Sequence, residues 1–199
     1  MSNIKFHPWI GKQYYKGFNG KRLLVLGESH YMEDPSEMTT TLTINVIEDL
    51  INPLSEHEGY KNTYTKFERA LAGRELSATE KASVWHSVAF YNYVQSPISG
   101  PRMSPTSSEF EYSELAFFEV LETLQPEYII AWGARLYENL PPKGRRLHVL
   151  RTPDGKDIEV WGYPTKNGKV IPLLPITHPS TTFIPSYWHE VISLFMASL

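Results

Sequence analysis

Four consecutive polar side chains that could take part in chemistry occupy positions 28 to 31. They are Glu28, Ser29, His30 and Tyr31. An acid, a hydroxyl, an imidazole and a phenol can exchange protons, orient water or bind a polar ligand. The mostly apolar segment Arg22–Leu26 precedes them and ends at Gly27, a pattern typical of a buried strand that stops in a tight turn. In open α/β sheets, binding and catalytic sites form at such strand ends.

Three later segments are also mostly apolar and end at a glycine turn or near residues that could take part in chemistry. They are Val88–Val94 with Asn92 near its end, Tyr128–Trp132 before Gly133, and Leu173–Ile176 before His178-Pro179-Ser180. Because helical segments alternate with these strands, we expect a mostly parallel sheet. Parallel strands of one sheet end at the same edge. The sequence therefore predicts one site that collects residues from four strand ends.

Helix-start and helix-stop signals lie between the predicted strands. Helices are expected from the Asp34-Pro35-Ser36-Glu37 start signal to about Ile51, over 63–72 before Gly73, from the Ser77–Glu80 capping box, from Ser113 to Gln125, over 134–140, and after a Ser186 cap. The Ser113 helix should carry Leu115, Phe118 and either Leu121 or Glu122 on one face. The apolar face of the last helix should carry Trp188, Val191, Ile192, Phe195 and Leu199. The segment before residue 22 has no clear period and is expected to pack across the core.

Two turn signals, Asp154-Gly155 and Asn167-Gly168, frame alternating residues within 152–174. This pattern predicts a β-hairpin inserted into the α/β order. The expected fold is a three-layer α/β/α sandwich, with a mostly parallel central sheet of about four strands plus the inserted hairpin. A chain of 199 residues is expected to form one domain over 1–199.

Composition narrows the class of protein. The formal net charge of −3 does not indicate a non-specific nucleic-acid binder, so DNA contacts would need a local basic face. The chain has no cysteine, which excludes disulfides, thiolate zinc sites and cysteine-ligated iron-sulfur clusters. The first 20 residues lack the apolar core of a secretory signal, and no apolar run approaches a membrane span. We therefore expect a cytoplasmic monomer without cofactor, metal or membrane partner.

Two loops could contact phosphate groups. The loop over 95–108 carries several hydroxyls, among them Ser104, and the cation Arg102, although proline- and serine-rich loops often only connect elements. The basic segment Lys143–Arg146 is either a DNA-facing loop or a solvated turn.

The order of these motifs resembles the uracil-DNA glycosylase superfamily over about residues 23–183. The motifs that carry the resemblance are Gly27-Glu28-Ser29-His30-Tyr31, Asn92 near its strand end, Ile129-Ile130-Ala131-Trp132-Gly133 and His178-Pro179-Ser180. The resemblance implies a DNA partner and excision of uracil or another deaminated base. Such an enzyme takes a base out of the stack and stabilises both an oxocarbenium-like sugar and an anionic leaving base.

The resemblance also implies roles for single residues. Gly27 and Ser29 would line the base site, Asn92 would pair with the amide-like edge of the base, and Tyr31 would pack against its C5 edge. His178 would donate a hydrogen bond to the departing base. Ser180, and less directly Ser104 and Arg102, would hold phosphates. Phe183 either fills the gap left by the flipped base or belongs to the core. For Asn92, the alternative to base recognition is a structural role in which its side chain links two loops.

The chain departs from the family pattern at one important position. The best-known branch has an aspartate two residues after the glycine, where this chain has Ser29. Another branch has glycine-glutamate, like Gly27-Glu28, but carries an iron-sulfur cluster that a chain without cysteine cannot hold in that way. Glu28 is therefore the candidate for positioning the water.

Two alternatives remain open at the level of sequence. A non-catalytic nucleobase or nucleic-acid binder of the same fold would explain the missing aspartate and the negative charge. A serine esterase could use Ser29 as nucleophile and His178 as base, but the aspartate usually found three residues before that histidine is Pro175 here.

Overall fold

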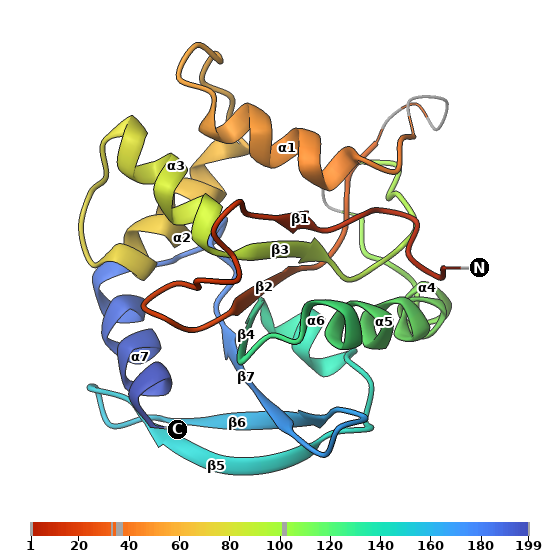
Figure 1. Ribbon diagram of the computed structural model, residues 1–199, viewed down its shortest axis with the longest axis vertical. Coiled ribbons are helices and arrows are strands. Elements are labelled where there is room, and N and C mark those ends of the chain that lie inside the picture. The colour runs from red at the N-terminus through yellow and green to blue at the C-terminus, as the bar shows by residue number, and fades with distance from the viewer. Residues whose placement is uncertain (1, 33, 35–37, 101–102, 199) are drawn as a thin grey trace.

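One sheet forms the centre of the protein. The computed structural model describes residues 2–32, 34, 38–100 and 103–198, and these form seven strands in the order β1-β3-β2-β4-β7-β6-β5 (Figure 1). Four neighbouring strands run parallel: β3 (Ala89–Asn92), β2 (Leu23–Gly27), β4 (Tyr128–Trp132) and β7 (Val170–Ile176). The predicted parallel strands are thus confirmed, and they define the edge at which their carboxyl ends lie.

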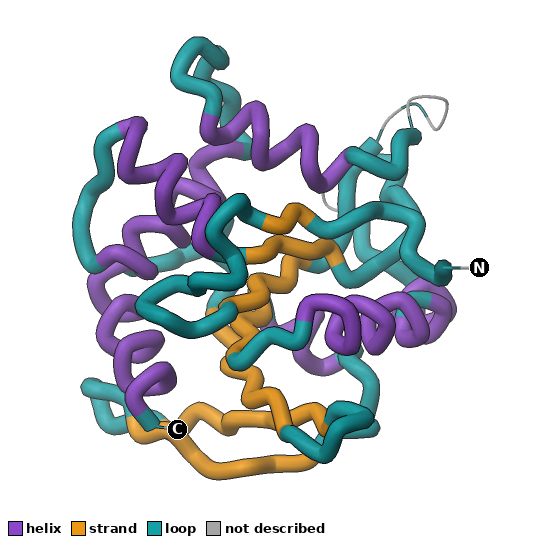
Figure 2. Tube along the Cα trace, viewed as in Figure 1, coloured by secondary structure: helices purple, strands orange, loops and turns teal. Residues whose placement is uncertain are grey.

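The two central parallel strands, β2 and β4, are buried along their whole length because helices cover both faces of the sheet (Figure 2). In β2, Leu23 and Val25 pack into one core cluster, whereas Leu24 and Leu26 pack into a second. This alternation follows from the two-residue period of a strand.

The helices divide between the two faces. The first cluster includes α1 (Leu42–Ile51), α2 (Lys61–Ala72), α3 (Ala78–Ser87) and α7 (Pro185–Ala197); the second includes α4 (Ser107–Tyr112), α5 (Glu114–Leu124) and α6 (Ala134–Glu138). The three layers expected from the sequence are present on the described residues.

The sheet is larger than predicted, and part of it is antiparallel. At one edge β1 (Trp9–Ile10) pairs antiparallel with β3, and at the other β5 (Arg145–Arg151) and β6 (Asp157–Pro164) continue antiparallel from β7. The prediction of about four strands plus an inserted hairpin was wrong in this respect. Both turn signals do connect antiparallel strands, but the last strand of the meander is β7 itself, which also pairs with β4.

Local signals predicted several helix ends correctly. Gly73 ends α2 with a positive φ of 74°, and Ser77 and Glu80 form the predicted capping box of α3. The four predicted apolar residues of α7 that the structure describes, from Trp188 to Phe195, are buried; Leu199 lies outside the described residues.

Other helix predictions were wrong. α1 begins only at Leu42, well after the predicted start signal, of which residues 35–37 lie outside the described residues. A capping box at Thr106 and Glu109 starts α4 inside the predicted loop. Leu115 is 61% exposed, because α5 turns Ala116, Phe117 and Val120 inward instead. Ser186 lies inside α7 rather than capping it, since the helix begins at Pro185.

None of the described helices is long and apolar enough to cross a membrane.

Candidate functional site

The carboxyl ends of the four parallel strands bring the predicted motifs to one edge. Gly27 and Asn92 are register partners at the ends of β2 and β3. The backbone N–H of Gly133, after β4, donates to the carbonyl of Ile176 at the end of β7 over 2.8 Å. Residues that are far apart in the sequence therefore share this edge, which we call the carboxyl edge.

Glu28 is held by Arg135 of α6, the helix that follows the neighbouring strand β4. Its side chain is 10% exposed, and the Arg135 guanidinium donates to both carboxylate oxygens, through Nε to Oε2 over 2.7 Å and through Nη2 to Oε1. A bidentate pair of this kind fixes the orientation of a carboxylate. Arg135 Nη1 also donates to the Ser104 hydroxyl, so one cation joins the loop after β2 to the loop after β3.

His178 contacts Ser180 through one of its ring nitrogens, Nδ1. Its Nδ1 lies 2.7 Å from Ser180 Oγ and accepts from the Ser180 backbone N–H over 3.2 Å. A neutral ring whose Nδ1 accepts carries its proton on Nε2. Burial lowers the pKa of His178 below its ordinary value, while the nearby Glu28 raises it and Arg135 lowers it. The neutral ring is thus favoured, and Nε2–H is the donor it offers.

Asn92 is buried beneath the loop after β2. Its side chain is 4% exposed and lies over Gly27, where a Cβ would overlap Asn92 Oδ1 and fall 2.9 Å from Phe90 Cζ. Gly27 is therefore needed at the end of β2 because Asn92 occupies the space that a side chain would take.

The imidazole of His30 covers the Asn92 amide. Asn92 Nδ2 lies 3.2 Å from His30 Nδ1 and 3.1 Å from Nε2, and Nε2 lies 2.8 Å from the hydroxyl of the buried Thr43 on α1. The ring also makes an edge contact with Phe6 at 5.1 Å between centroids. Burial lowers the pKa of His30 to about 4, so the ring is neutral at neutral pH.

The loop after β2 runs beside the loop after β3. The N–H groups of Val94 and Ile98 donate to the carbonyls of Glu28 and His30, and Met32 N–H donates back to Ile98. Tyr31 is 54% exposed in this paired segment, and Ser29 is half-buried. His178 Nδ1, the ring nitrogen that an esterase triad would direct at an aspartate, contacts the Ser180 hydroxyl instead.

The residues predicted to contact phosphates lie in different surroundings. Ser180 is exposed beside His178, and Ser104 contacts Arg135, whereas Arg102 lies outside the described residues. Phe183 is buried and stacks on Trp188 with ring centroids 5.9 Å apart, which is the core position that the sequence left open.

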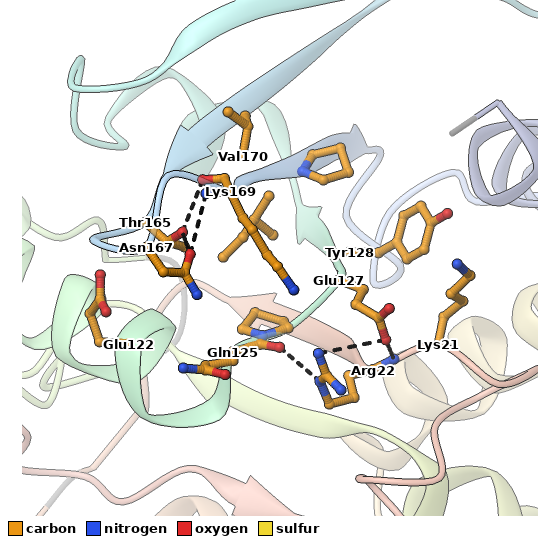
Figure 3. Close-up of a pocket in the computed structure, with 13 residues that line it drawn as sticks. Lys21, Arg22, Glu122, Gln125, Glu127, Tyr128, Thr165, Asn167, Lys169 and Val170 are labelled. Carbon is orange, nitrogen blue, oxygen red and sulfur yellow. Dashed lines mark hydrogen bonds and ion pairs between the residues drawn. The ribbon is translucent and has the colours of Figure 1, made fainter.

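Two cavities lie away from this edge. One, of about 260 Å³, opens at the opposite ends of the strands and is lined by Arg22, Glu127, Tyr128, Lys169 and Val170 among others (Figure 3). The other, of about 170 Å³, lies among Tyr137, Pro141 and Trp161. Neither cavity is lined by Glu28, Asn92 or His178, so none of these three residues faces either cavity.

The described residues contain no cluster of three or more histidine, aspartate or glutamate side chains placed to hold a metal.

Neither Arg135 nor the contact between His30 and Asn92 was predicted from the sequence. Arg135 follows Trp132-Gly133 by two residues, so the rule that singled out the other strand ends applied to it as well. His30 was identified as a polar residue at the strand tip, but its packing on Asn92 depends on α1, which the local sequence does not indicate.

Comparison with known proteins adds no relative: neither the models of known protein families nor the curated proteins include a match to this chain.

Proposed function

We propose that this protein is a DNA glycosylase-like hydrolase that removes uracil or a related deaminated base from DNA by cleaving the N-glycosidic bond. The observation that carries the proposal is the placement of His178, a neutral imidazole whose Nε2–H has no hydrogen-bond partner among the described residues, within electrostatic reach of the oriented carboxylate of Glu28. The reaction needs a donor for the departing base and an anion for the sugar.

His178 meets the first requirement. As the N-glycosidic bond breaks, electrons pass to the base, whose oxygen becomes a strong hydrogen-bond acceptor. A neutral Nε2–H can donate to that oxygen without carrying a charge into the site, and the contact between Nδ1 and the Ser180 N–H keeps the ring in the required tautomer.

Glu28 meets the second requirement. A carboxylate can accept about four hydrogen bonds, and Arg135 uses two of them. The remaining positions can orient a water molecule toward C1′ of the sugar, while the carboxylate charge stabilises the cationic sugar. The water then supplies the oxygen of the new C1′–OH, and its proton leaves through the carboxylate.

Asn92 would read the base, and this step requires a movement. Its amide now contacts His30, so a base can pair with Asn92 only when the His30 ring turns away. The segment that would move, 28–32, is held to 94–98 by the backbone hydrogen bonds described above.

The test is excision from defined oligonucleotides. The pure protein is incubated with single- and double-stranded oligonucleotides containing uracil, hypoxanthine or xanthine, and abasic sites are measured by alkaline strand cleavage. Abasic sites at one of these bases are expected, and their loss in Glu28→Gln with the fold retained. A folded protein that cleaves none of the substrates contradicts the proposal.

One observation favours a second candidate, a non-catalytic binder of nucleobases or nucleic acid. Glu28 and Asn92 both have protein partners already, Arg135 and His30, as expected of side chains with a structural role. This candidate predicts DNA or base binding without turnover, and the same affinity in Glu28→Gln. Measuring affinity and excision on the same variant separates the two functions.

A further inference from the structure

Two cations flank His178 at the carboxyl edge, and neither was among the residues singled out from the sequence. Arg135 lies on the first turn of α6, with a side chain 48% exposed. Lys66 lies on α2, and its Nζ donates to the backbone carbonyl of Thr181, three residues after His178, over 3.2 Å. Arg135 joins the site from one layer of helices and Lys66 from the other.

Arg135 is more than the partner of Glu28. The carboxylate it holds is largely buried, while the guanidinium extends to the surface. Three of its N–H groups donate to Glu28 and Ser104, so among the described residues two are left for a ligand. Arg135 is also close enough to His178 and Tyr31 to interact electrostatically with both.

Lys66 places its ammonium at the turn that follows His178. The Thr181 hydroxyl and N–H are both occupied by the carbonyl of His178, at 2.9 and 3.0 Å, which fixes the turn after the histidine. Ser180 is exposed on the same turn. A phosphate that approaches this turn would meet one charged donor, Lys66, and one hydroxyl, that of Ser180. Arg135 and Ser104 provide the same pair of groups on the other side of His178.

We propose that Arg135 and Lys66 each bind a backbone phosphate of the DNA strand whose nucleotide enters the site, with Ser104 and Ser180 as their neutral partners. This inference rests on the proposed contact with DNA and extends it. It explains how an acidic chain could hold a polyanion: the contact needs two placed cations, not a basic surface.

The salt dependence of binding tests the proposal without turnover. Glu28→Gln serves as the parent, because it removes the charge that Arg135 neutralises and the excision that would consume the substrate. Arg135→Met, Lys66→Met and both together are added to it. Affinity for a single-stranded uracil oligonucleotide is measured by fluorescence anisotropy over a series of salt concentrations.

Each lost phosphate contact should lower the slope of log affinity against log salt by about 0.7, and both together by about 1.4. Arg135→Lys keeps the charge and should keep the slope while weakening binding, because lysine lacks the planar fork. Arg151→Met is the matched control: this exposed arginine pairs with Asp157 on the β5–β6 hairpin, and its loss should leave the slope unchanged.

The outcomes separate this inference from the proposed function. Parent binding with unchanged slopes in both methionine variants overturns the inference and leaves the glycosylase proposal standing. Lowered slopes without excision by the wild type support the phosphate contacts and point to the non-catalytic binder. A wild type that binds no DNA overturns both.

Discussion

The two ends of the four parallel strands carry similar polar side chains in different arrangements. At the carboxyl edge, Glu28, Asn92 and His178 are each fixed by a close partner, namely Arg135, His30 and Ser180. At the amino end, Arg22 and Glu127 form an ion pair at 3.8 Å, and the Arg22 backbone N–H donates to Glu127 over 3.1 Å, beside an open cavity of about 260 Å³ (Figure 3). The cavity and the three predicted site residues are thus at opposite ends of the strands.

This difference separates two candidate locations for a functional site. The cavity at the amino end lies between strand ends and a hairpin turn, and incomplete packing alone can produce such a space. Burying a carboxylate, an amide and an imidazole together costs free energy unless each is hydrogen-bonded. The three side chains at the carboxyl edge have such partners, and the function that we propose places the site there. The predictions below test the contrast between the two ends, beginning with the largest effect.

Acidification should destabilise the protein through His30. The pKa of this buried imidazole is lowered to about 4 from an ordinary value of 6.5, so between these values the unfolded state binds more protons than the folded state. Stability should therefore fall as pH drops from about 6.5 to about 4, with a loss of up to about 3 kcal/mol from this group. Urea unfolding at several pH values measures it.

The control for this prediction is a histidine at the surface. His30→Gln should flatten the pH dependence in that interval, and His57→Gln, which changes an exposed residue, should leave it unchanged. An equally steep dependence in His30→Gln would assign the effect to other groups.

A methyl group at Gly27 should also be costly. In Gly27→Ala the new Cβ meets the buried Asn92 amide and the Phe90 ring, so the end of β2 must shift. We expect a loss of about 2 kcal/mol in the free energy of unfolding and of any excision activity. Gly59→Ala, where a Cβ has nothing within 4 Å, should be close to neutral. Equal unfolding midpoints for the two variants would contradict the packing described.

Removing the hydroxyl that supports His30 should have a smaller effect. Thr43→Val keeps the shape of a fully buried residue but leaves His30 Nε2 without its 2.8 Å partner. The expected loss is about 1 kcal/mol. Denaturant unfolding measures it, and Thr123→Val is the control, because that hydroxyl bonds its own helix at an exposed position. A Thr43→Val protein as stable as the wild type would show that this contact adds nothing.

Changes at the amino end should matter least. Lys169 is exposed on the rim of the cavity, so Lys169→Ala should change stability by less than about 0.5 kcal/mol and leave the proposed DNA binding unchanged. A large loss of binding in this variant would move the site to the opposite end of the strands.

The sequence was informative where a signal is local. The apolar runs of β2 and β4, the glycine that ends α2 and the capping box of α3 each depend on neighbours within a few residues, and each was predicted. The edge at which Glu28, Asn92 and His178 gather followed from the alternation of strands and helices.

Contacts between distant segments could not be predicted in this way. β1 is two residues long and exists because Trp9 and Ile10 pair with β3, some 80 residues away. The contact of His30 with Thr43 depends on where α1 packs, and the bond between Arg135 and Ser104 depends on two loops from different strands. The partners of the site residues, rather than the residues themselves, were therefore the part that needed the structure.

The most direct test of the site compares two histidines in the excision assay. His178→Gln removes the Nε2–H donor at the carboxyl edge, and His148→Gln changes a histidine on β5, away from the parallel strand ends. Release of uracil, or of whichever deaminated base the wild type removes, should persist in His148→Gln and fall by about 100-fold or more in His178→Gln, with both proteins folded. Equal activity in the two variants, or no excision by the wild type, would contradict the assignment of the carboxyl edge as a base-excision site.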